Sequence, residues 1–282
     1  MDTRFWGPSG WHLLHILAAK PVRNPSAVKE WMELLEYVLP CKYCRASFHE
    51  YMRLQPITLP IIQSPTLFSR WMYDIHNLVN AKLRSQGLLS GTDGKDGTDP
   101  KWSGIQKHYA SMTCETSPLV GWDFMTSVAY STPSSDYVAV PMPGAPAHIS
   151  DIPTKNRYNL LSRKERLTLL RRWWELIPSI LPCDSWKRAW AASADPIPLT
   201  EGREAVLSWM WRVEEKVCAG LRCPTPHPSL PALKYEVAVF ESNCGRVKRG
   251  KTCRTRKHRL KRKVLSRRRA RFAAYHTRGL DM

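Results

Sequence analysis

Apolar residues along this chain recur at spacings of three and four, and this pattern predicts an all-helical fold. The clearest run is 65–84, where Leu67, Trp71, Ile75 and Leu78 fall on one face of a helix. Proline and serine residues stand between the runs, as expected for helix caps and connections. The predicted helices are 6–19, 26–40, 41–53, 65–84, a short stretch ending at 109, 158–181, 183–192 and 200–221.

Composition divides these helices into two parts. Residues 115–154 are rich in Ser, Thr, Pro and Gly, which predicts a linker, although 122–130 within it is apolar enough to pack on either side. We therefore predict one helical domain over 1–114, a second of unassigned role over 155–243, and a C-terminal tail over 244–282. We expect most of the 12 Trp residues to pack in the two cores.

The net charge of +19 is concentrated in the tail. Residues 244–282 contain 16 Lys and Arg against one acidic residue, whereas the rest of the chain carries a net charge of only +4. Such a segment predicts attachment to nucleic acid or to an acidic protein, or a nuclear address. It predicts no sequence-specific recognition, because phosphate contacts carry no base code.

Eight cysteines are too scattered along the chain for a small disulfide scaffold. The first residues lack a signal-peptide pattern and no run of eighteen apolar residues occurs, so we expect a soluble cytoplasmic protein without a membrane span. In that compartment we expect the cysteines to be free, catalytic or metal-bound rather than structural.

Cys41 and Cys44 form a Cys-x-x-Cys pair directly after Pro40, at the start of a predicted helix. Two cysteines one turn apart form a reducible disulfide, and the helix N-terminus favours the thiolate. Thioredoxins and zinc sites share this motif, so the pair alone is ambiguous.

The predicted helix 65–84 carries polar residues on one face. His76 and Asn80 lie one turn apart there, with Asn77 beside them. A solvated helix face is one reading of these residues. The other is a face covered by a polar cofactor, which would satisfy their hydrogen bonds.

Taken together, the motifs resemble the Erv/ALR family of FAD-linked sulfhydryl oxidases, most of all the forms encoded by large DNA viruses. Residues 6–15, Trp-Gly-Pro-Ser-Gly-Trp-His-Leu-Leu-His, resemble the opening motif of that family. Residues 40–44 resemble its redox pair, and residues 76–83, His-Asn-Leu-Val-Asn-Ala-Lys-Leu, resemble its His-Asn helix. The resemblance covers residues 4–110.

This resemblance implies a four- or five-helix bundle that holds FAD noncovalently and oxidises dithiols of protein substrates to disulfides. Electrons would pass through Cys41 and Cys44 to FAD and then to O2, which gives H2O2. Cys41 would exchange with incoming thiols, and Cys44 would face the flavin. The resemblance also implies a homodimer. It assigns FAD contacts to Trp6, Gly7, Trp11, His15, His76, Asn77, Asn80, Lys82, Lys107 and Tyr109.

The chain departs from the family in two places. Where members often have a histidine three residues after the second cysteine, this chain has Ser47, with His49 two residues further on. A second, structural cysteine pair is missing between residues 82 and 109. The viral forms are similarly lean, so we expect a viral protein of the host cytoplasm, virus factory or virion, with the nucleus as an alternative.

The remaining cysteines leave more than one reading open. Cys218 with Cys223, or Cys244 with Cys253, would serve as a shuttle pair that relays electrons to the core pair, or all four are unpaired thiols. A zinc site made from Cys218, Cys223, His227 and Cys244 lacks standard ligand spacing, so we predict no metal. The alternative function is a basic nucleic-acid-binding virion protein with a redox-inactive oxidase-like domain.

Overall fold

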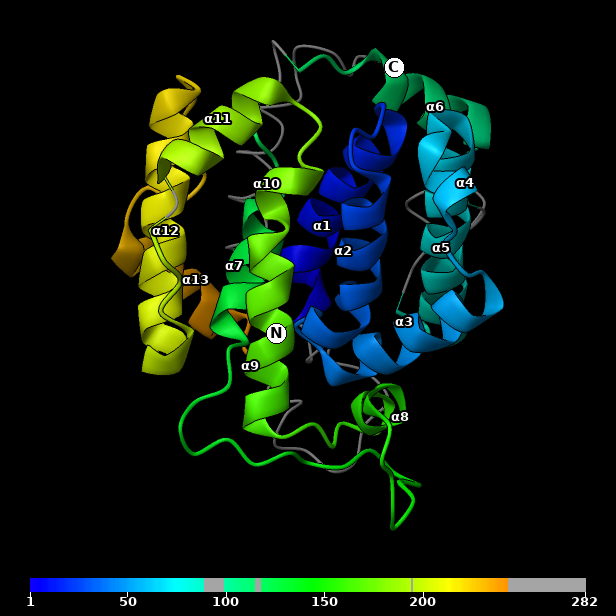
Figure 1. The fold of residues 1–282 in the computed structure, drawn as a ribbon, viewed down its shortest axis with the longest axis vertical. Coiled ribbons are helices and arrows are strands. Elements are labelled where there is room, and N and C mark those ends of the chain that lie inside the picture. The colour runs from blue at the N-terminus through cyan, green and yellow to red at the C-terminus, as the bar shows by residue number, and fades with distance from the viewer. Residues whose placement is uncertain (89–98, 115–117, 194, 243–282) are drawn as a thin grey trace.

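Helices account for all the regular structure in residues 1–88, 99–114, 118–193 and 195–242, the parts that this computed structural model describes (Figure 1). The all-α fold class is confirmed. The basic tail, with Cys244 and Cys253, lies outside the described residues. The elements are α1 (Thr3–Ala19), α2 (Pro25–Val38), α3 (Lys42–Leu54), α4 (Leu59–Gln63), α5 (Pro65–Ser85), α6 (Trp102–Ser111), α7 (Trp122–Tyr130), α8 (Ile152–Arg157), α9 (Arg163–Glu175), α10 (Ile177–Ile180), α11 (Asp184–Ser193), a 3-10 helix (Leu199–Glu201), α12 (Arg203–Gly220) and α13 (Leu230–Val239).

Helices α1 and α2 lie in the middle of the molecule, with α3 to α6 on one side and α7 and α9 to α13 on the other (Figure 1). One face of α1 packs against α5 and α6, and another packs against α7. Because α1 is buried on both sides, it is apolar along most of its length. In the described residues, no helix is both long and apolar enough to cross a membrane.

The predicted linker contains a buried helix, α7, which packs between α1 and α12. Its start requires a glycine, because Gly121 has φ +94° and a Cβ there would lie 2.7 Å from a side-chain carbon of Leu13. The small polar side chains Thr126 and Ser127 are fully buried within it. A Ser- and Thr-rich composition therefore did not prevent this stretch from packing in the core.

A stack of tryptophans joins the two helical parts. Trp31 of α2 stacks on Trp173 of α9 with ring centroids 5.1 Å apart, and Trp173 also meets Phe124 of α7 edge-on at 5.8 Å. The chain of rings continues from Trp174 to Trp209 of α12 at 5.3 Å. These aromatic rings belong to one continuous core, which holds the second helical part against the first.

The predicted helix 158–181 is wrong in its first part. Asn159 has a left-handed backbone with φ 56°, which a helix does not continue through. The helix α9 begins only after Ser162, whose side chain caps it in a reciprocal arrangement with Glu165. Residues 152–157 instead form the separate short helix α8, which packs against α3.

One pair of cysteines departs from the expectation of free, catalytic or metal-bound thiols. Cys114, after α6, is disulfide-bonded to Cys183, before α11, with Cα atoms 5.3 Å apart. The two cysteines are 69 residues apart in sequence. The bond therefore links the first helical part to the second across a long loop.

We expect Cys114→Ser to lower the free energy of unfolding by about 3 kcal/mol, because it releases a long loop in the unfolded chain. Urea unfolding of the variant and of the unmodified protein, each with and without a phosphine reductant, measures this loss. The variant already lacks this disulfide, so the reductant should not lower its free energy of unfolding any further through this bond. An unchanged unfolding midpoint for Cys114→Ser would contradict the prediction.

Candidate functional site

The Cys-x-x-Cys pair lies at the N-terminus of α3, as the sequence predicts. Cys41 is the N-cap, and its Sγ accepts a hydrogen bond from the backbone N–H of Cys44 at 3.3 Å. Cys41 is buried and disulfide-bonded, and Cys44 is half-buried. The implied bond between Cys41 and Cys44 is absent from this structure.

Polar side chains from α3 and α5 surround Cys44. Lys82 donates a hydrogen bond to Oγ of Ser47, one turn after Cys44, and the Tyr51 hydroxyl donates to the carbonyl of Leu78 at 3.4 Å. Burial lowers the pKa of Lys82, and the nearby charge of Cys44 partly opposes this shift. Burial and the same charge raise the pKa of Tyr51. An ammonium group beside Cys44 favours its thiolate.

A cluster of aromatic and imidazole rings lies between α1, α5 and α6. The rings of Trp11 and His76 stack with centroids 3.9 Å apart, and Nε2 of His15 lies 3.0 Å from Nδ1 of His76. The ring of Tyr109 stacks on that of His15 with centroids 4.8 Å apart. Burial, aided by the charges of His76 and His108, lowers the pKa of His15 to about 3, and burial lowers that of His76 to about 4. Both imidazoles are therefore neutral at pH 7.

Amide and carboxylate groups extend this cluster along α5. Nδ2 of Asn80 lies 3.4 Å from Oδ1 of Asn77 and 3.2 Å from Oδ1 of Asp99. Nη1 and Nη2 of Arg84 donate hydrogen bonds to the two carboxylate oxygens of Asp99, at 2.8 and 2.9 Å, which lowers the pKa of that carboxyl. The His-Asn helix therefore presents a line of polar groups, of which His76, Asn77 and Asn80 were predicted.

Three of the residues predicted to contact FAD are not part of the ring cluster. Trp6 packs against Phe124 of α7 at 5.9 Å, on the core side of α1. A Cβ at Gly7 would meet nothing within 4 Å, so that side of α1 is open. The side chain of Lys107 is exposed, whereas its neighbours His108 and Tyr109 are partly buried beside the ring cluster.

Sequence reasoning did not assign several residues to the site. His12 lies 3.4 Å from the Tyr109 hydroxyl, and Asp99 binds Asn80. His12 was inside the opening motif, one residue after Trp11, and this was its only signal. His49, two residues after Ser47, lies toward Glu36 of α2, with its Nδ1 3.1 Å from Oε2 of Glu36.

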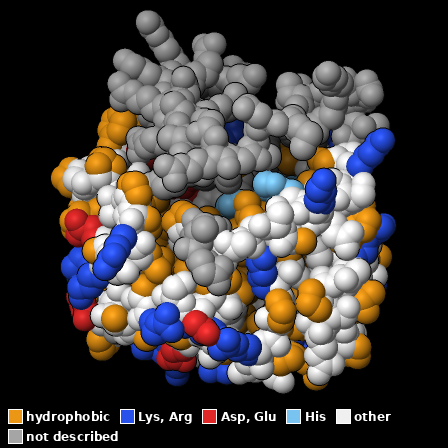
Figure 2. Space-filling model, turned by 90° about the horizontal axis from the view of Figure 1, so that it is seen from above, with side chains coloured by type: hydrophobic (Ala, Val, Ile, Leu, Met, Phe, Trp, Pro, Cys, Tyr) orange, Lys and Arg blue, Asp and Glu red, His pale blue; other side chains and the backbone are white. Residues whose placement is uncertain are grey.

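Histidine side chains are visible on the face seen in Figure 2.

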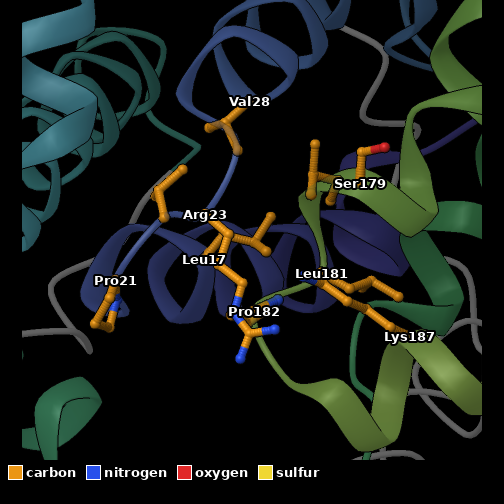
Figure 3. A pocket seen from close by; sticks show the side chains of 10 residues that line it. Leu17, Pro21, Arg23, Val28, Ser179, Leu181, Pro182 and Lys187 are labelled. Carbon is orange, nitrogen blue, oxygen red and sulfur yellow. The ribbon is translucent and has the colours of Figure 1, made fainter.

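A small pocket lies between the α1–α2 connection and the segment from α10 to α11 (Figure 3). Its lining includes Leu17, Arg23 and Lys187. It is barely large enough for one water molecule, so it does not hold a cofactor. Of the residues considered for zinc, His227 is instead held between Glu214 and Asp123.

The ring cluster and its polar neighbours fit FAD. A flavin or adenine ring binds flat aromatic faces such as Trp11 and Tyr109, and its nitrogens and oxygens bind neutral imidazoles and amides. Lys82 supplies a cation for phosphate or for a reduced ring. The donor set and the half-buried ring faces are those that such a cofactor needs.

Comparison with known proteins places the similarity in the first helical part. Residues 8–96 match the Erv1 / Alr family. The chain is 33% identical over 88 residues to the mitochondrial FAD-linked sulfhydryl oxidase ERV1 of Saccharomyces cerevisiae, covering 29% of this chain and 45% of that protein. It is 31% identical over 85 residues to a probable FAD-linked sulfhydryl oxidase, R368, of Acanthamoeba polyphaga mimivirus, covering 28% and 59%.

A third relative is matched over most of its length. The FAD-linked sulfhydryl oxidase of an African swine fever virus isolate is 31% identical over 97 residues, covering 32% of this chain and 77% of that protein. The chain thus spans about half the length of the yeast and mimivirus proteins. Viral and eukaryotic relatives match at similar identity. No solved structure matches.

Proposed function

Because this chain belongs to the Erv1 / Alr family, we propose that it is an FAD-linked sulfhydryl oxidase that forms disulfide bonds in protein substrates. The observation that carries the proposal is the Cys-x-x-Cys pair at the start of α3, with an ammonium group beside its second cysteine. FAD is the cofactor that the names of the relatives state.

The thiol chemistry follows from this arrangement. A substrate thiolate attacks Sγ of Cys41 in the Cys41–Cys44 disulfide, a mixed disulfide forms, and Cys44 leaves as a thiolate. The second substrate thiol then attacks the mixed disulfide, which releases Cys41 and the oxidised substrate. Lys82 stabilises the negative charge at Sγ of Cys44.

Trp11, His15, His76, Asn77, Asn80, Lys82 and Tyr109 are the residues that would hold the cofactor. FAD, when bound, takes up two electrons and passes them to O2, which gives H2O2. The neutral imidazoles of His15 and His76 can each donate and accept one hydrogen bond, so they orient a polar ring without adding charge.

The direct test is the visible flavin absorption of the purified protein, together with oxygen consumption driven by dithiothreitol. We expect Trp11→Ala to weaken FAD binding about tenfold, because it removes a stacking face worth about 1.4 kcal/mol. Titration of the apoprotein with FAD measures the change, with Tyr235→Ala, an exposed aromatic residue, as the matched control. A colourless protein that FAD cannot reconstitute would overturn the proposal.

Three further features belong to this proposal. The charge of residues 244–282 supports binding to nucleic acid or acidic partners. Salt-dependent retention on DNA, measured with and without that segment, tests this.

Family resemblance supports a homodimer. Sedimentation at several protein concentrations tests it. A cytoplasmic, virus-factory or virion location follows from the viral relatives, and nuclear entry would follow from the basic segment.

A further inference from the structure

Residues beyond the family match contact the start of the redox helix. Arg45 is one turn after Cys41, and its side chain folds back so that Nη1 donates to the carbonyl of Leu39 at 2.8 Å. Its Nη2 donates to Oδ1 of Asn159 at 2.7 Å. The guanidinium charge therefore lies at the N-terminal end of α3, where Cys41 is the N-cap.

Asn159 also binds a second guanidinium. Nη2 of Arg166, on α9, donates to the same Oδ1 of Asn159 at 3.0 Å, and its Nε donates to the Tyr137 hydroxyl at 2.8 Å. Nδ2 of Asn159 donates to the carbonyl of Val140 at 2.8 Å. Lys42, between the two cysteines, reaches the same carbonyl at 3.5 Å. All these side chains except that of Tyr137 are buried, with Arg45 and Arg166 each 8% exposed.

Two features of Asn159 matter for this network. It holds a left-handed backbone at φ 56°, a conformation that asparagine adopts more readily than other non-glycine residues. It also offers one neutral amide oxygen to two buried guanidinium groups, where a carboxylate of the same shape would be the stronger partner. A neutral acceptor orients both cations and leaves their charge in place.

We infer that Asn159 and Arg166 are positioning residues for the redox pair: they hold the Arg45 guanidinium at the start of α3, where its charge stabilises the Cys41 thiolate. The inference rests on the proposed function of the pair and deepens it. A stabilised thiolate favours the reduced form, so the disulfide formed by Cys41 is more oxidising. The part of the chain outside the family match thus tunes the oxidising power of the site.

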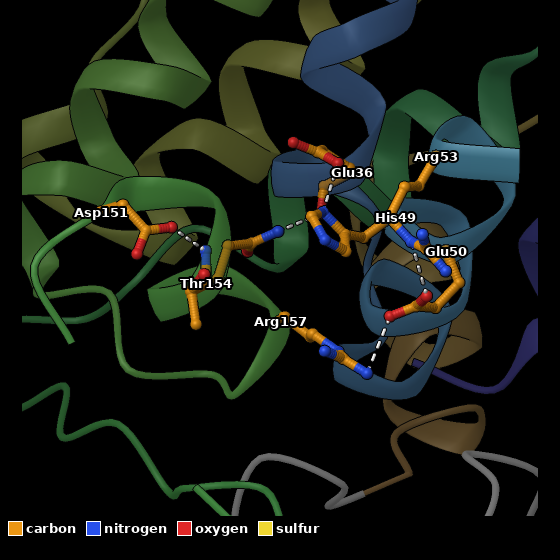
Figure 4. Close-up of polar contacts among 8 residues, drawn as sticks. Glu36, His49, Glu50, Arg53, Asp151, Thr154 and Arg157 are labelled. Carbon is orange, nitrogen blue, oxygen red and sulfur yellow. Dashed lines mark hydrogen bonds and ion pairs between the residues drawn. The ribbon is translucent and has the colours of Figure 1, made fainter. Parts of the chain in front are cut away.

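The test is Asn159→Asp, which keeps the shape and adds one negative charge between the two guanidiniums. The control is Arg157→Gln, which changes the net charge by the same amount and lies in the same α3–α8 contact. Figure 4 shows that Arg157 instead pairs with Glu50, at 2.9 Å, along the body of α3. The full chain is equilibrated in glutathione redox buffers, and mass spectrometry of alkylated protein gives the fraction of Cys41 in a disulfide.

We expect Asn159→Asp to make the Cys41 disulfide about tenfold harder to reduce, a potential lower by about 30 mV, while Arg157→Gln stays within about twofold of the unmodified protein. If Asn159→Asp does not fold, Arg166→Gln decides and should shift the equilibrium in the same direction. An equilibrium constant within twofold for the deciding variant overturns the inference. This readout needs neither FAD nor O2, so its failure is distinct from failure of the oxidase proposal.

Discussion

Replacement of Cys44 by serine is expected to lower dithiothreitol-driven oxygen consumption by about three orders of magnitude or more. Serine cannot form the Cys41–Cys44 disulfide, so the substrate thiolate has no bond to attack and no thiolate is released beside Lys82. The N-cap sulfur of Cys41 and the helix itself remain, so the loss reports chemistry and not folding. Oxygen-electrode rates and circular dichroism of the same preparation separate the two.

Two further variants sharpen this prediction. Cys41→Ser should lose as much as Cys44→Ser, because both sulfurs belong to one bond. Tyr235→Ala, an exposed position on α13, is the control. Its rate should stay within about twofold of the unmodified protein. Turnover above a tenth of the unmodified rate in Cys44→Ser would exclude the proposed role of the pair.

Long amphipathic helices are predictable from this sequence because one stripe of apolar residues records which face is buried. The prediction 65–84 differs from α5 by one residue at its C-terminal end. Helix α7 has no such stripe, since nearly all its side chains are buried on every side, Thr126 and Ser127 included. The Ser, Thr, Pro and Gly residues of 115–154 as a whole predicted a linker, although the stretch 122–130 was apolar enough to pack. Burial between α1 and α12 is a tertiary effect that local composition does not encode.

The site residues also fall into two groups: those that contiguous sequence motifs predict, and those that only the folded chain brings to the site. Trp11, His76 and Asn80 come from contiguous motifs, and α1 and α5 bring them together. Lys107 was placed by analogy on a short helix whose rotation the sequence does not fix, and α6 turns His108 and Tyr109 inward instead. Asn159 and Arg166 are more than a hundred residues from Cys41, with no periodic signal linking them, so only the folded chain places them by α3.

His227 is the centre of a second buried charge cluster, away from the redox pair. Its Nδ1 lies 2.7 Å from Glu214 of α12 and its Nε2 lies 3.1 Å from Asp123 of α7. The backbone N–H of His227 also donates to Glu214 at 2.8 Å. Burial acts to lower the pKa of His227, but the charge of Glu214 and the bonds to both carboxylates outweigh it and raise the pKa to about 9. An imidazolium thus joins α7, α12 and the connection to α13.

We expect His227→Gln to lower the free energy of unfolding by about 3–5 kcal/mol at pH 6.5, because it leaves two buried carboxylates without their cation. Additional replacement of Glu214 by glutamine should restore part of that loss, since one of the two buried charges is then gone. His148→Gln, at an exposed position, is the matched control and should change stability by less than about 0.5 kcal/mol. Urea unfolding measures all three.

The pH dependence identifies the charge directly. A pKa raised from 6.5 to about 9 stabilises the fold fully below pH 6.5, and this stabilisation is lost as the pH rises through about 9. The unmodified protein should therefore lose about 3 kcal/mol more than His227→Gln between pH 6.5 and 9.5. Parallel stability curves for the two proteins would show that His227 is neutral in the fold. The cluster would then be held together by hydrogen bonds and not by an ion pair.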